Sequence, residues 1–216
     1  MTAAEYVIFC GSVFSALIPL TFLRRFPGDA MRYVVLLVLA SFLTDLTLSF
    51  VVKDRYFIGN TIYGFIESFL LFQFFLLTLP KLRRVIISIM CLFFVFYMIS
   101  AFHLEAGKFN TYACSLESLI MICLALVSFY RFYHNEDDIF LERSSIFWVN
   151  VAVILYFSGA FFSFILSPEI LGGPMPWSFF HVSNIIKNIF FGIAVFQFNR
   201  QIKREHTVAS DAMTVE

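Results

Sequence analysis

Long apolar stretches alternate with short polar segments along the whole chain. Each stretch has about twenty residues, the length at which an α-helix rising 1.5 Å per residue crosses about 30 Å of hydrocarbon. The short connections are typical of antiparallel neighbours, so we predict an all-α, seven-helix transmembrane bundle. The predicted spans are 6–23, 33–52, 57–79, 85–102, 111–130, 146–166 and 179–198. They form one transmembrane domain over residues 1–198, followed by a short tail, 199–216, that we expect to be disordered.

The composition favours a protein that lies in lipid. Of the 216 residues, 60% are hydrophobic and only 14% are charged, and 31 are phenylalanine. A soluble domain of this length needs more charged residues to cover its surface. The basic residues lie close to the predicted span ends, where they match anionic lipid headgroups. We therefore expect the lipid bilayer as a partner and exclude nucleic-acid binding.

The lysines and arginines are distributed unevenly between the two sides of the predicted bundle. One side, which includes the tail, has Arg24, Arg25, Arg32, Lys81, Arg83, Arg84, Arg131, Arg143, Arg200, Lys203 and Arg204. The other side has Lys53, Arg55 and Lys108. Because basic residues are enriched in cytoplasmic loops, we predict an outside N-terminus and a cytoplasmic C-terminus. The predicted location is the inner (plasma) membrane of a bacterial cell.

Ionisable residues lie inside four of the predicted spans: Asp45, Glu67, Glu117 and Lys187. Such groups cost at least a few kcal/mol each in hydrocarbon, so they normally face the bundle interior and pair with one another. The rise per residue places all of them between the membrane midplane and its outer third. Polar residues at helical spacing accompany them: Asn60, Tyr63, Ser118, His181, Asn184 and Asn188. We predict that these ten residues form a polar cavity that opens to the outside.

A purely structural role is the alternative for this cluster. Buried polar residues hold membrane helices together, at about 0.6–2 kcal/mol per contact. Lys187 could then neutralise either Glu67 or Glu117 as a structural ion pair. Three acids against one amine nevertheless leave two carboxyls that need a proton or cavity water. This excess favours a site that binds a small polar ligand or responds to external pH.

Short motifs in the later spans resemble a group of bacterial membrane proteins. They are Tyr63…Glu67, Glu117-Ser118-Leu119, Phe147-Trp148, Leu155-Tyr156-Phe157-Ser158-Gly159 and His181…Asn184-Ile185…Asn188-Ile189. They look like those of uncharacterised bacterial seven-helix integral membrane proteins, which resemble the membrane halves of two-component sensors. The resemblance implies a receptor-like or sensor-like protein in signal transduction, acting through a separate cytoplasmic or membrane partner.

A retinal protein is one other possibility. Lys187 and Glu67 lie where microbial rhodopsins have their Schiff-base lysine and a counterion, so retinal on Lys187 is conceivable. However, Ser183 occupies the position four residues before the lysine, where those proteins have an acid.

Two further functions stay open. Residues 41–46 resemble part of the lysoplasmalogenase-type membrane proteins, with Thr44 in place of a glycine, which would suggest an intramembrane lipid hydrolase. The second of these functions is a proton or cation pathway along Asp45, Glu67 and Glu117. The sequence assigns no catalytic residue, and it predicts no metal site because His103 and His181 lack a ligand spacing.

Overall fold

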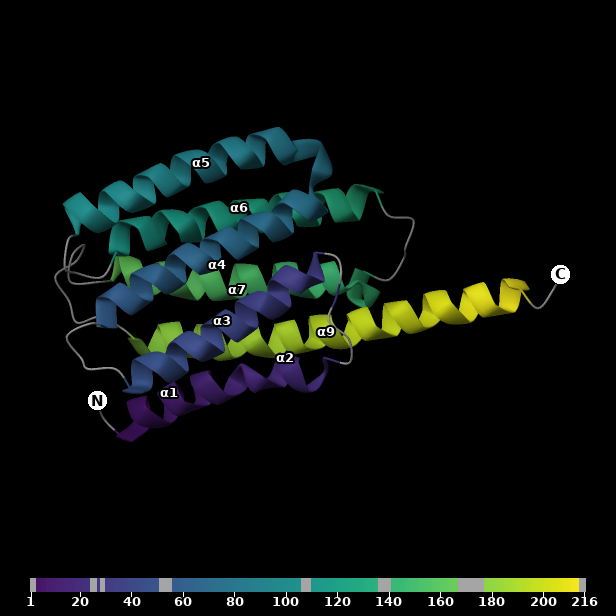
Figure 1. The fold of residues 1–216 in the computed structure, drawn as a ribbon, viewed down its shortest axis with the longest axis horizontal. Helices are drawn as coiled ribbons and strands as arrows, with labels where there is room; N and C mark the ends of the chain where they lie inside the picture. Colours follow the sequence, from purple (N-terminus) through teal and green to yellow (C-terminus); the bar gives the residue numbers. More distant parts are fainter. Residues whose placement is uncertain are drawn as a thin grey trace.

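The computed structural model describes residues 3–23, 27, 30–50, 56–105, 110–135, 141–166 and 177–213. These residues form an all-α bundle (Figure 1). The helices are α1 (Ala3–Ser15), α2 (Leu17–Thr21), α3 (Met31–Phe50), α4 (Tyr56–Thr78), α5 (Arg83–Ile99), α6 (Thr111–Asn135), α7 (Ser145–Ile165) and α9 (Trp177–Met213). Short turns are η2 (Pro80–Leu82), the π-helical η3 (Ser100–Leu104) and η4 (Leu141–Arg143). The all-α prediction is confirmed, and every predicted span overlaps a helix, the first being divided between α1 and α2.

The chain is a multi-pass membrane protein. In the described part of the chain, five segments are long and apolar enough to span a membrane: Ile58–Thr78, Pro80–Leu104, Thr111–His134, Ser145–Ile165 and Phe179–Arg204. Val7–Thr21 is apolar but shorter. Large apolar side chains cover the outside of the bundle, such as Leu92, which is 72% exposed. An apolar surface of this extent is stable only in contact with lipid.

The first span breaks at Ala16. Pro19 has no backbone N–H to bond to the carbonyl of Ser15, and its ring would clash with that carbonyl in a continuous helix. The sequence predicts a kink from this proline, and α1 accordingly ends at Ser15 before α2 begins at Leu17.

Two close approaches fix the helices that surround the site. α7 packs against both α6 and α9, and α1 packs against α9. A Cβ atom on Gly159 of α7 would collide with the side chain of Ser183 on α9. On the other side, Tyr97 of α5 donates a 2.7 Å hydrogen bond to the carbonyl of Thr61, beside Gly64 of α4. The two glycines therefore leave room for side chains of the neighbouring helices, as small residues commonly do in membrane bundles.

The C-terminal helix is longer than the sequence predicts. We expected a disordered tail from residue 199, but α9 continues as a helix through Met213, which corrects that prediction for 199–213. This segment contains no glycine or proline and includes good helix formers such as Arg200, Gln201 and Lys203. Figure 1 shows that α9 extends well beyond the rest of the bundle at its C-terminal end.

Candidate functional site

An ion pair lies in the interior of the bundle. Nζ of Lys187, on α9, is 3.4 Å from Oε1 of Glu67, on α4. Lys187 is 2% exposed and Glu67 is 5% exposed. Both charges are therefore withdrawn from water and lipid, and each depends on the other for compensation.

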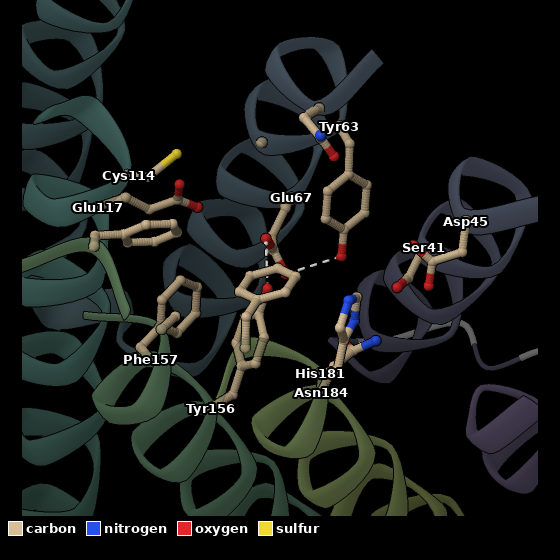
Figure 2. Close-up of a pocket in the computed structure, with 15 residues that line it drawn as sticks. Ser41, Asp45, Tyr63, Glu67, Cys114, Glu117, Tyr156, Phe157, His181 and Asn184 are labelled. Carbon is tan, nitrogen blue, oxygen red and sulfur yellow. Dashed lines mark hydrogen bonds between the residues drawn. The ribbon is translucent and has the colours of Figure 1, made fainter. Parts of the chain in front are cut away.

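Two tyrosines complete the hydrogen bonding of Glu67. Tyr63, one turn earlier on α4, donates to Oε1 at 3.0 Å, and Tyr156 of α7 donates to Oε2 at 3.2 Å. Figure 2 shows the carboxylate between these two hydroxyl groups. Nζ of Lys187 also lies 4.0 Å from the centre of the Tyr156 ring, a cation–π contact. Tyr156 thus contacts both members of the pair and joins α7 to α4 and α9.

The first helix fixes the position of α9 beside this pair. Nδ2 of Asn184 donates to Oγ of Ser12, and Nδ2 of Asn188 donates to Oγ of Ser15, each at 2.8 Å. Asn184, Lys187 and Asn188 follow a helical spacing, so they share one face of α9. The two amide contacts to α1 therefore set the rotation of α9 that points Lys187 into the bundle.

A small cavity adjoins the ion pair. Its free volume is about 40 Å³, which is room for about three water molecules. α3, α4, α6, α7 and α9 all contribute to its wall (Figure 2). The lining residues are Ser41, Asp45, Asn60, Tyr63, Gly64, Glu67, Cys114, Glu117, Tyr156, Phe157, Ala160, Phe164, Phe180, His181 and Asn184.

Two further carboxyl groups face this cavity. Glu117 of α6 is 3% exposed, and its Oε1 has no hydrogen-bond partner among the described residues. Ser68 lies within hydrogen-bonding reach of the same side chain. Asp45 of α3 is half-buried and interacts electrostatically with Lys187 and Glu67. Three acids therefore lie around one amine, so two of the carboxyl groups need a proton or water beside them.

Most of the residues that the sequence singles out surround this one cavity. Asp45, Asn60, Tyr63, Glu67, Glu117, His181 and Asn184 line it. Lys187 lies behind the lining and reaches Glu67 and Tyr63. Two residues lie apart from the cavity. Ser118 donates to the carbonyl of Cys114 on its own helix, and Nδ2 of Asn188 donates to Oγ of Ser15 on α1.

The site also contains side chains that the sequence pattern does not indicate as site residues. Tyr156 is the most important of these, since it bonds to Glu67 and covers Lys187. The sequence feature that could indicate it is a tyrosine in the middle of an otherwise apolar span. Ser41 and Cys114 lie on the polar stripes of their spans and line the cavity wall.

The geometry does not fit retinal. A retinal Schiff base needs an accessible amine at the end of a long apolar pocket, whereas Lys187 is paired with Glu67 and covered by the Tyr156 ring. The free volume beside it holds only a few water molecules. His181 packs edge-on against the ring of Phe9. Within the described ranges, no three His, Cys, Asp or Glu side chains are grouped to hold a metal ion.

Comparisons of the chain with protein-family models, with curated proteins and with solved structures find no match.

Proposed function

We propose that this protein is a receptor-like membrane sensor in which a small cation, protons included, acts on the Glu67–Lys187 pair and α9 passes the change to a separate signalling partner. The observation that supports it best is that Lys187 and the projecting C-terminal segment belong to one uninterrupted helix. At 1.5 Å per residue, Met213 lies about 40 Å along the helix from Lys187. A rigid helix of this kind moves at its far end when it shifts at the site.

The orientation is part of the proposal. The bundle has seven membrane passes, with α1–α2 and α3 as the additional ones, an outside N-terminus and a cytoplasmic C-terminus. The uneven distribution of basic residues supports this direction. The cavity then lies in the outer half of the membrane, and the segment 199–213 of α9 enters the cytoplasm of a bacterial cell.

The ligand class follows from charge and size. One amine faces three carboxyl groups, and the cavity has about 40 Å³ of free volume. A cation near Glu67 or Glu117 competes with Lys187 for the carboxylates and weakens the attraction between α4 and α9. The bundle then has two states with different positions of α9, and a cation that binds them unequally shifts their populations.

Hydrogen–deuterium exchange of the full-length protein in lipid nanodiscs tests this proposal. Wild-type protein is compared in sodium chloride and choline chloride, at acidic and neutral pH, and exchange is read over residues 199–213. We expect exchange in this segment to depend on pH or sodium. Lys187→Met and Glu67→Gln are expected to abolish that dependence, and the milder Tyr63→Phe to reduce it.

Asn150→Ala is the matched control. It removes a buried 2.8 Å contact to Ser128 that involves no charge, so it loosens the bundle without touching the ion pair. If 199–213 exchanges identically under all conditions, or responds in the same way in the control and the Lys187 variant, the sensor proposal is wrong.

A proton or cation pathway is a second candidate. It is favoured by Oε1 of Glu117, which has no hydrogen-bond partner among the described residues and lies beside a cavity with room for a few water molecules. Against it, buried Phe72, Phe75 and Phe191 fill the interior one to two turns beyond Glu67 and Lys187. Proteoliposomes with an internal pH-sensitive dye distinguish the two functions. Flux that is lost in Glu117→Gln supports the pathway, whereas its absence in wild-type protein favours the sensor.

A further inference from the structure

A second and larger cavity lies at the other end of the bundle. Its free volume is about 220 Å³, roughly five times that of the cavity beside Glu67. Its wall comes from the end of α4, from η2, from the last turns of α6 and from the start of α7. The lining residues are Thr78, Leu79, Pro80, Lys81, Ser128, Arg131, Phe132 and Ile146. We propose that it is a binding site for a phosphate-bearing anion, namely the headgroup of an anionic phospholipid.

The chain geometry that creates this cavity begins at Pro80. A residue before proline is disfavoured in the α-helical region, so α4 ends at Thr78 and Leu79 adopts a non-helical conformation. Leu79 is buried and anchors the turn. The turn then places Lys81 in the cavity wall together with Arg131, from the last turns of α6. Two cations from separate elements thus share one cavity.

The charge of the wall is positive. Lys81 and Arg131 are its ionisable members, and neither forms an ion pair with any residue that the structure describes. Arg131 is half-buried, and a guanidinium group can bind a phosphate through two parallel hydrogen bonds. Basic pockets between spans on the cytoplasmic side are a recurrent form of anionic lipid site.

A buried hydroxyl group gives independent support. Ser128 is 4% exposed, and its Oγ accepts a 2.8 Å hydrogen bond from Nδ2 of Asn150. Other helical serines, such as Ser68 and Ser118, donate to the carbonyl four residues earlier. No acceptor for the Ser128 hydroxyl group is assigned among the described residues, and Ser128 lines the cavity wall. An anion with oxygen acceptors would complete its bonding.

The position favours a lipid over a free phosphate ion. The cavity lies where α4 and α6 end and α7 begins, which is the expected level of the lipid headgroups. Tyr130 and Tyr133, on either side of Arg131, are 67% and 75% exposed, as is typical of aromatic residues at a membrane interface. A headgroup in the cavity would leave its acyl chains along the exposed apolar faces of the helices.

Native mass spectrometry of the full-length protein, released from mixed phosphatidylcholine and phosphatidylglycerol micelles, tests the proposal. The double variant Lys81→Gln/Arg131→Gln is compared with Arg83→Gln/Arg84→Gln, which removes the same charge at the same end but outside the cavity wall. We expect the cavity variant to lose about tenfold or more in phosphatidylglycerol binding, and the control less than about twofold. Equal loss in both variants, or no loss in either, would overturn the site.

Two further arms complete the design. Arg131→Lys keeps the charge but cannot form the bidentate hydrogen bond of a guanidinium group. An intermediate loss of phosphatidylglycerol binding is therefore expected, and it can be measured even if the double variant folds poorly. Titration with inorganic phosphate separates the two sources of the anion. Phosphatidylglycerol retained in excess phosphate supports the lipid, whereas displacement by millimolar phosphate, dependent on Lys81 and Arg131, would overturn the lipid assignment in favour of the free ion.

Discussion

Lys187 of α9 and Glu67 of α4 form an ion pair of 3.4 Å that is almost fully buried. The residues are 120 positions apart in the chain. Their contact therefore links α4 to α9, the last helix that the structure describes. A pair of this kind has two consequences, since it is costly to disrupt one partner at a time and it is sensitive to any charge that enters beside it.

The stability of single and double variants at this pair should differ in a characteristic way. Glu67→Gln or Lys187→Met alone leaves an uncompensated buried group, so each is expected to destabilise the protein by about 3–5 kcal/mol. The double variant removes both charges and is expected to be more stable than the sum of the two single effects predicts. Thermal unfolding in detergent provides the measurement. Strict additivity of the two effects would show that the two charges do not interact.

The two contacts of Tyr156 can be separated by substitution. Tyr156→Phe keeps the ring over Lys187 but removes the 3.2 Å hydrogen bond to Glu67, with an expected cost of about 1–3 kcal/mol. Tyr156→Leu also removes the cation–π contact and should cost about 1–2 kcal/mol more. Equal melting temperatures for the two variants would argue against a role for the ring. The same unfolding assay measures both.

Helix positions and the convergence of the acids could be predicted from the sequence for a simple physical reason. A charge in hydrocarbon has few stable environments, so Asp45, Glu67 and Glu117 had to face the bundle interior. The end of α4 at Thr78 agrees with local backbone chemistry, because a residue before proline is disfavoured in the helical region.

The choice of partners could not be predicted. Either Glu67 or Glu117 could have paired with Lys187 by depth alone. The selection of Glu67 depends on the tertiary arrangement that brings the side chains of Tyr156 and Lys187 to its carboxylate. Ser12 bonds to Asn184 across 172 positions, a contact that no local pattern indicates. The helical continuation of α9 was missed because a polar segment after a span gives no hydrophobic signal, although its residues have good helix propensity.

Close packing between α7 and α9 depends on Gly159. A methyl group at this position would collide with Ser183, so Gly159→Ala is expected to destabilise the protein by about 1–3 kcal/mol. Ser183→Ala removes the nearest obstructing atom, Oγ, but keeps Cβ 2.9 Å from the new methyl group, so partial rescue is expected in the double variant. Melting temperatures of the three variants test this. Full tolerance of Gly159→Ala alone would mean that the two helices can separate freely.

Substitution of Glu117 tests whether its carboxyl group has a functional or only a structural role. Its buried Oε1 has no described hydrogen-bond partner, so the side chain costs free energy in the folded protein. If Glu117 is kept for cation binding, Glu117→Met should be neutral or stabilising by about 1–2 kcal/mol, because it removes this cost at similar length. The same variant should lose any dependence of the melting temperature on sodium or pH. A carboxyl group that only joins helices predicts the opposite, namely a lower melting temperature with an unchanged dependence. Ser118→Ala, one residue further on α6 and outside the cavity, is the control that should leave the dependence intact.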